Sequence, residues 1–201
     1  MSNARMDPQP PPPAMTDGAL VAATLGGDRQ AFDVLVGRYQ RQATAVAFGL
    51  LGNVDDAQEV VQESFLRAYR KLSSLSSPER FGAWLLRIVS NQSLNFRRGR
   101  ALRRTLSLHP VDDSDDRPEL TVADAGAGTP DQAAEAGELK EAIRQAIDEL
   151  PETQRLALVL FSIQKLPQKQ VAEILNLSVE AVKWHVFSAR KKLKDRFKDS
   201  L

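Results

Sequence analysis

The residues best suited to bind a charged partner lie in the last quarter of the chain. Between Lys183 and Lys198 there are seven lysines or arginines and a single acid, Asp195. Basic residues in a last helical turn complement the helix dipole in any protein, but dipole complementation requires fewer than these. Such a density of positive charge is typical of a surface that neutralises phosphates, so nucleic-acid binding is favoured over a plain helical bundle.

A pair of helices joined by a short turn must position these side chains. Residues 168–175 carry an apolar stripe, Asn176 and Leu177 form the turn, and Ser178 is a suitable N-cap for the next helix. In that second helix the residues expected to face inward recur at steps of three and four: Val179, Val182, Val186, Ala189 and Leu193. The residues left on the other faces are Lys183, Trp184, His185, Phe187, Ser188, Arg190, Lys191 and Lys194. This layout predicts a helix-turn-helix whose second helix lies in the major groove of DNA.

A net charge of +1 conceals a strong segregation of charge along the chain. Residues 80–104 contain seven arginines and no acid, whereas residues 105–138 contain nine acids and one base, Arg117. Fold stability gains nothing from sorting like charges together, so the pattern indicates charged partners.

The apolar periodicity predicts an all-α chain with two small domains. We expect a disordered proline-rich tail over 1–15, beginning with a remnant of recombinant expression, and a helical domain over 16–104. An acidic, flexible linker over 105–134 should lead to the second helical domain, 135–201. In the first domain we expect four helices. The first is capped by Asp17 and ends at Leu25, and the second is capped by Asp28 and ends at Gly52. The third runs from Asp55 to Leu72, and the fourth is opened by Pro78 and runs to about Arg104. Helical spacing places Tyr69 among the inward-facing residues. Trp84 is a candidate for stacking on a base, but its helical phase with Phe81 and Leu85 favours a core position.

Several classes of function are disfavoured by composition. The chain has no cysteine, and its two histidines, His109 and His185, lack a ligand-like spacing, so we expect no metal and no other cofactor. There is no glycine-rich phosphate loop and no nucleophile arrangement, which argues against an enzyme. Neither an apolar run of 18 residues nor a signal peptide occurs, so we expect no membrane insertion and a cytoplasmic protein.

Two long segments resemble a known family. DDAQEVVQESFLRAYRKL (Asp55 to Leu72), followed by FGAWLLRIVSNQSLNFRR (Phe81 to Arg98), closely resembles region 2 of the extracytoplasmic-function (group IV) sigma factors of the sigma-70 family. Ala146 to Leu193 is similar to region 4 of the same family, and the two matches occur in the family's order. The resemblance implies an RNA polymerase sigma factor that binds core polymerase through its beta-prime and beta subunits and directs promoter recognition and opening in transcription initiation.

The resemblance also implies where core polymerase binds. In the family, an acidic helix of region 2 docks on a coiled coil of the beta-prime subunit, and the matching residues are Asp56, Glu59, Gln62, Glu63 and Arg67. Exposed carboxylates can pair with a basic partner surface and orient it. From charge alone the alternative is equally good, because Glu63 and Arg67 can form an i,i+4 pair on a solvated face.

The promoter contacts follow in the same way. The loop before the fourth helix forms a pocket for a flipped base in similar proteins, and that helix supplies amides for base edges and guanidinium groups for phosphates. The residues implied for the -10 element are Ser74, Ser76, Ser77, Arg80, Asn91, Gln92, Asn95, Arg97 and Arg98. The residues implied for the -35 element are Glu180, Lys183, Trp184, His185, Phe187, Ser188 and Lys191. Trp184 either contacts DNA or packs under the preceding helix, and the sequence leaves both open.

Two other functions remain as alternatives. A polymerase-independent helix-turn-helix regulator would explain residues 179–193 but not the segment from Asp55 to Arg98. A structural helical adaptor would leave the arginines as solvated faces. The family resemblance further implies an anti-sigma factor as a partner, which nothing in the residues identifies.

Overall fold

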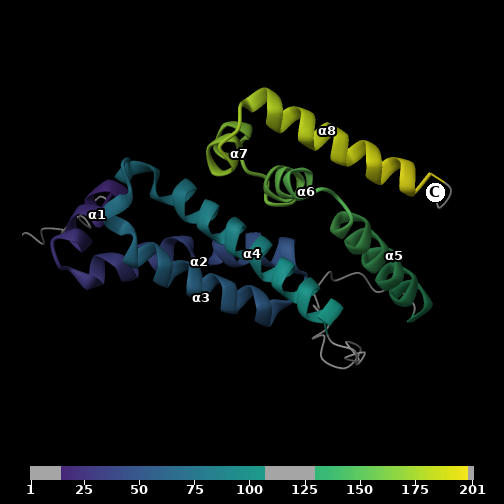
Figure 1. Ribbon diagram of the computed structural model, residues 1–201, viewed down its shortest axis with the longest axis horizontal. Coiled ribbons are helices and arrows are strands. Elements are labelled where there is room, and N and C mark those ends of the chain that lie inside the picture. Colours follow the sequence, from purple (N-terminus) through teal and green to yellow (C-terminus); the bar gives the residue numbers. More distant parts are fainter. Residues whose placement is uncertain (1–14, 107–129, 199–201) are drawn as a thin grey trace, which may run out of the picture.

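The computed structural model describes residues 15–106 and 130–198, and every regular element in these ranges is helical (Figure 1). The predicted tail up to residue 14 and residues 107–129 of the predicted linker lie outside the described residues. The first half contains α1 (Asp17–Leu25), α2 (Arg29–Leu51), α3 (Val54–Arg70), η1 (Leu72–Ser74), η2 (Pro78–Arg80) and α4 (Phe81–Leu106). The second half contains α5 (Pro130–Asp148), α6 (Glu152–Leu158), the π-helical turn η3 (Val159–Ile163), α7 (Gln168–Leu175) and α8 (Val179–Arg196). The helical parts of α4 and α5 thus reach into both ends of the range 105–134 that the sequence predicted as linker.

The start of α1 differs from the prediction. Thr16, not Asp17, is the N-cap, since its hydroxyl accepts a hydrogen bond from the Ala19 amide at 3.3 Å. The Asp17 carboxylate instead accepts hydrogen bonds from Arg38 and from the Tyr39 hydroxyl, both on α2. Burial, followed by the hydrogen bond to Asp17, raises the pKa of Tyr39 well above its usual value. Asp17 therefore fastens α1 to α2 because the neighbouring threonine has already taken the capping role.

The other helix ends of the first half follow local backbone chemistry. Asp28 caps α2 as predicted, accepting from the Gln30 amide at 2.9 Å. Gly52 ends α2 with φ of 71°, a left-handed conformation that glycine adopts without steric cost. Asn53 then caps α3, which begins at Val54. Pro78 opens the 3-10 turn η2 and not α4 itself, so the prediction that proline starts the fourth helix was wrong.

Aromatic rings form the centre of the first half. Phe32 packs edge-on against Phe65 at 6.5 Å and against Phe81 at 6.3 Å between ring centroids. Trp84 is half-buried and packs on Phe81 at 6.0 Å. Tyr69, which the sequence placed inside, is 43% exposed, although its ring still touches Phe32 at 5.0 Å. The prediction of an inward Tyr69 was therefore wrong.

The helix-turn-helix forms as the sequence predicted. Asn176 ends α7 in the left-handed region with φ of 56°, and the Ser178 hydroxyl accepts from the Ala181 amide at 3.0 Å to cap α8. Val182, Val186 and Ala189 of α8 are buried. The second half also holds a buried guanidinium that local patterns did not predict. Arg155 of α6 donates to the carbonyls of Ile147 (3.0 Å), Asp148 and Leu150 (2.8 Å), and so binds the carboxyl end of α5.

The two halves lie against each other. Figure 1 shows α4 on the side of the first half that faces α6 and α7, with α8 along the outer edge of the second half. Buried residues of both halves, among them Leu85 and Val159, belong to one continuous apolar cluster. No helix within 15–106 or 130–198 is both long and apolar enough to cross a membrane.

Candidate nucleic-acid interface

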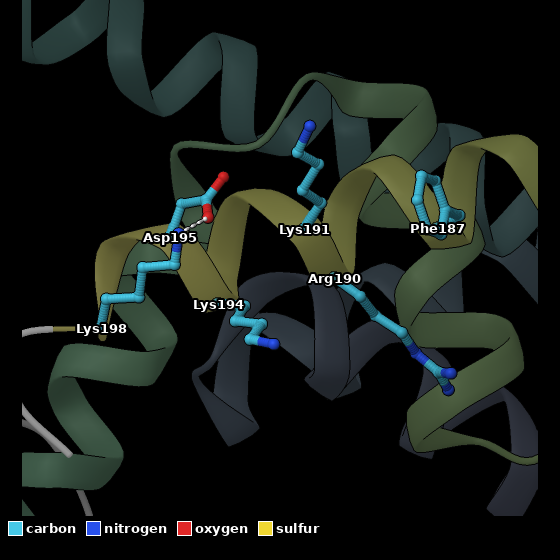
Figure 2. Close-up of a pocket in the computed structure, with 6 residues that line it drawn as sticks. All are labelled: Phe187, Arg190, Lys191, Lys194, Asp195 and Lys198. Atoms are coloured by element: carbon cyan, nitrogen blue, oxygen red, sulfur yellow. Dashed lines mark ion pairs between the residues drawn. The ribbon is translucent and has the colours of Figure 1, made fainter.

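The outer face of α8 presents aromatic and basic side chains together. Trp184 is 59% exposed and Phe187 is 68% exposed, while Lys183 and Lys191 on the same side are also exposed. Figure 2 shows the next part of this face, a shallow hollow lined by Phe187, Arg190, Lys191, Lys194, Asp195 and Lys198. Thymine methyl groups are one apolar feature that DNA offers to such side chains in the major groove.

Part of the predicted -35 set lies away from this face. The Ser188 hydroxyl is half-buried and accepts a hydrogen bond from Gln154 Nε2 of α6 at 3.2 Å. His185 is also half-buried, with its ring edge-on to Trp184 at 4.9 Å. The Trp184 indole is exposed and does not pack under α7, so of the two alternatives only contact with DNA agrees with its position. Glu180 is exposed in the first turn of α8.

Arg190 is held in place by its neighbours. Its guanidinium lies 5.8 Å from the centre of the Phe161 ring and donates to the Ser162 hydroxyl at 3.0 Å. Both partners belong to η3, and both contacts favour a position of this positive charge at the edge of the basic face.

A polar hollow of about 470 Å³ lies between α3 and α4. The residues that line it are Arg67, Lys71, Ser74, Trp84, Ile88, Asn91, Gln92, Leu94, Asn95 and Arg98. It brings together five residues of the predicted -10 set, namely Ser74, Asn91, Gln92, Asn95 and Arg98. Arg67 joins them with its Nη1 3.4 Å from Gln92 Oε1, although the sequence grouped it with the polymerase-binding residues.

Lys71 lines this hollow although site prediction missed it, and Trp84 lines it although the sequence favoured a core position over stacking on a base. Lys71 follows the last residue of α3, and its carbonyl accepts a hydrogen bond from the Ser74 hydroxyl at 2.7 Å. Trp84 offers one aromatic surface to the core and another to the hollow. Its helical phase marked it as core, and only the packing of α3 against α4 reveals the second surface.

Four residues of the predicted -10 set do not line the hollow. Ser76 is exposed and Ser77 is half-buried in the loop before η2. Arg80 is exposed and lies 3.7 Å from Glu173 of α7. Arg97 donates to Asp148 Oδ1 at 2.6 Å and to the Leu50 carbonyl at 2.8 Å. Arg98, at the edge of the hollow, donates to both carboxylate oxygens of Glu152.

The acidic face of α3 is open to solvent. Glu59, Gln62 and Glu63 are exposed, whereas Asp56 is half-buried and pairs with Arg100 of α4 at 2.9 Å. Leu66 is 51% exposed on the same helix and was missed, because a single outward leucine is common on any helix. Exposed carboxylates and an exposed apolar side chain therefore occur together on this helix, a combination suited to a docking surface.

An all-helical chain with a basic helix-turn-helix on one half and a polar, cation-lined hollow on the other has the build of a DNA-binding transcription protein. Comparison with known proteins is specific: residues 35–103 match the family described as Sigma-70 region 2, and residues 140–193 match Sigma-70, region 4.

Relatives cover nearly the whole chain. The ECF RNA polymerase sigma-E factor of Haemophilus influenzae is 30% identical over 185 residues, which is 90% of this chain and 95% of that protein. The RNA polymerase sigma-H factor of Pseudomonas aeruginosa is 31% identical over 174 residues, covering 87% and 90% of the two chains. Among solved structures, CnrH in complex with the cytosolic domain of CnrY matches with a TM-score of 0.64 and 26% identity, covering 92% of this chain and 99% of that one. The chain belongs to the extracytoplasmic-function group of the sigma-70 family: it is an RNA polymerase sigma factor that directs transcription initiation, and not an enzyme.

Proposed function

We propose a division of labour between three surfaces of this sigma factor. The exposed face of α3, with Glu59, Gln62, Glu63 and Leu66, docks core polymerase, while Asp56 orients α4 through Arg100. The hollow between α3 and α4 takes an extruded base of the -10 strand. The outer face of α8 binds the -35 element through Lys183, Trp184, Phe187 and Lys191, with Glu180 at its start.

One observation carries this proposal furthest, the convergence of amides, cations and an aromatic ring in the hollow. An extruded base needs hydrogen-bond partners for its edge, an apolar or aromatic surface for its ring and positive charge for the neighbouring phosphate. Asn91 and Asn95 supply the hydrogen-bond partners, and Trp84 supplies the aromatic surface. Arg67 and Lys71 supply the positive charge. Arg67 therefore moves from the polymerase-binding group to the DNA-binding group.

Run-off transcription on a library of random promoters tests the function as a whole. Purified core polymerase with this protein should yield transcripts whose templates share an upstream and a downstream motif. A protein that binds DNA without the polymerase would yield none, and would also fail to retain core polymerase in a pull-down.

The docking surface is tested by charge reversal. Glu59→Lys with Glu63→Lys should weaken binding to core polymerase at least about tenfold, because opposed like charges repel across an interface. Asp33→Lys with Glu138→Lys is the matched control, since both carboxylates are exposed, neither lies on α3, and the change in net charge is the same. Equal affinities of the two variants for core polymerase would contradict the assignment.

We further infer an inhibitory protein partner and a place in the cytoplasm, beside the polymerase. Two similar solved structures support the first point: CnrH is bound to the cytosolic domain of CnrY, and the sigma factor RpoE of Bartonella quintana is bound to the anti-sigma factor NepR. A partner of this kind that covers the acidic face of α3 would compete with core polymerase for the chain.

A further inference from the structure

Trp184 is a large apolar side chain that the packing of α8 does not use. The helix packs through Val182, Val186 and Ala189, which are buried, whereas the indole is 59% exposed. Three residues further along, Phe187 is 68% exposed, and residues at this spacing are neighbours on a helix surface. The two rings together form an aromatic patch, and contiguous exposed apolar surface is typical of a binding site.

His185 contacts the indole and favours one orientation of it. The imidazole lies edge-on to the Trp184 ring, with 4.9 Å between ring centroids and 75° between ring planes. It is half-buried, and its Nδ1 is buried without a hydrogen-bond partner in the described part of the chain. His185 therefore contributes the shape of its ring and not a hydrogen bond at Nδ1. A side chain whose orientation is already favoured loses less rotamer freedom when it binds a partner.

Basic side chains precede and follow the aromatic patch along α8. Lys183 comes before it, and Arg190, Lys191 and Lys194 come after it, the last three shown with Phe187 in Figure 2. A protein that covered the patch would also have to compensate these charges, whereas duplex DNA carries phosphates along both edges of its grooves. The occupant that fits is therefore the major groove of DNA, which the first turns of a recognition helix enter.

The major groove offers few apolar groups to an aromatic side chain. The faces of paired bases are stacked on one another, so only the base edges reach the groove. The apolar group on those edges is the C5-methyl group of thymine. The modified base 5-methylcytosine carries the same group at the same ring position, whereas cytosine and uracil carry a hydrogen atom there.

We propose that Trp184 is a specificity-determining residue that reads the C5-methyl group of a pyrimidine in the -35 element, with His185 as its positioning residue. This inference rests on the proposed function, which assigns α8 to the -35 element, and adds the identity of a base. Trp184 and Phe187 are about 4.5 Å apart along the helix axis, close to the spacing of about 3.4 Å between successive base pairs. The methyl group read by Trp184 therefore belongs to a base pair next to the position nearest Phe187, or to the one beyond it.

Selection from random duplexes tests which group is read. The probes are two pools of short duplexes with a random centre. One pool contains thymine and cytosine, and the other contains uracil and 5-methylcytosine, so the C5-methyl group moves from one pyrimidine to the other. The full-length protein selects from each pool at low salt, where phosphate contacts strengthen binding to every duplex, and the bound duplexes are sequenced. At the position read by Trp184, losing the methyl group should lower enrichment of a pyrimidine about fourfold, and gaining it should raise enrichment about fourfold.

Variants assign this position to the indole. In Trp184→Ala the enrichments there should be the same in both pools, and the fold should stay intact because the side chain is exposed. His185→Ala should reduce the difference between the pools, whereas His185→Phe, which keeps a ring, should retain it. Lys194→Ala is the control, since loss of an exposed positive charge should weaken binding to both pools alike and leave the difference between them unchanged.

The proposal is overturned if no position follows the methyl group from one pyrimidine to the other. It is equally overturned if Trp184→Ala shows the same methyl preferences as the wild type, or if neither pool yields a selected motif. Failure of the proposed function would appear separately, as absent transcription with core polymerase although a methyl-dependent motif is selected.

Discussion

Gly82 and Gly37, both in helices, differ in whether the neighbouring residues leave room for a Cβ atom. A Cβ at Gly82 would lie 2.6 Å from Cε1 and 2.7 Å from the hydroxyl oxygen of Tyr39. That ring cannot move away easily, because Asp17 holds its hydroxyl and Phe81 lies against it at 5.6 Å. At Gly37, by contrast, an added Cβ meets nothing within 4 Å.

Alanine at these two positions should change stability in opposite directions. Gly37→Ala should raise the free energy of unfolding by about 0.5–1 kcal/mol through backbone entropy. Gly82→Ala should lower it by roughly 1–3 kcal/mol through overpacking. Denaturant unfolding of both variants and the wild type measures the difference. Stabilisation by both substitutions would mean that Tyr39 relaxes freely.

Trp184 and Ser188 both belong to the predicted -35 set, but Trp184 is exposed whereas Ser188 is bonded to Gln154 inside the protein. Trp184→Ala should weaken binding to -35 duplex DNA by about 1–2 kcal/mol, about tenfold, through loss of an apolar contact with bases. Its effect on thermal stability should be small because the indole is 59% exposed. Ser188→Ala should leave DNA affinity nearly unchanged, since its hydroxyl is engaged by Gln154. Fluorescence anisotropy with promoter duplexes would show the split, and a larger loss for Ser188→Ala would reverse the assignment.

Among the helices, α8 depends on its first turn for both folding and recognition. Ser178 accepts a hydrogen bond from the Ala181 amide, and Glu180 complements the helix dipole in the same turn. The residues that follow at once are those expected to meet base edges. A frayed first turn would therefore disturb DNA binding as well as stability.

Removal of this cap should be measurable in two ways. Ser178→Ala should cost about 1 kcal/mol of stability and also weaken binding to -35 DNA. Thr16→Ala is the matched control, since Thr16 caps α1 in the same way but far along the chain from α8. Both variants should lose similar stability in thermal unfolding, but only Ser178→Ala should lose DNA affinity. A loss of affinity in both would point to global destabilisation.

For the whole molecule, the ion pairs between the two halves are sensitive to pH and salt. The hydrogen bond from Arg98 lowers the pKa of Glu152, and the positive charges of Arg155 on the same helix and Arg97 on α4 act in the same direction. A carboxylate with a lowered folded-state pKa contributes stability above its unfolded pKa of about 4.3 and loses it as pH falls through the lowered value.

The stability difference between wild type and Glu152→Gln should consequently shrink as the pH drops below about 4. It should be constant from about pH 6 to 8, where the carboxylate remains ionised in both states. Denaturant midpoints across this range measure it. A difference that persists unchanged at pH 3, with the protein still folded, would show that Glu152 acts through packing and not through charge. Raising ionic strength to 1 M, where the screening length falls to about 3 Å, should also reduce this stability difference at neutral pH.

The chain's own pattern determined the helices, most of their ends and the helix-turn-helix. Asp28, Gly52, Asn176 and Ser178 act within a few residues of themselves, and buried α8 side chains such as Val182 recur at steps of three and four. Interactions of this range are visible in the order of residues. The error at Asp17 arose because two neighbouring residues can both cap α1, and the error at Pro78 arose because a 3-10 turn directly precedes α4.

Only the tertiary structure decided which charges are free and which are paired. Arg97 and Asp148 lie 51 residues apart, and Arg87 and Ile174 lie 87 apart, so no local pattern connects them. Arg67 and Gln92, 25 residues apart, meet because α3 packs on α4. Sequence periodicity fixes the direction of a side chain relative to its own helix, whereas the partner on that side depends on how helices pack. Arg97 and Arg98, which helped to mark this chain as a DNA-binding protein, also join its two halves for that reason.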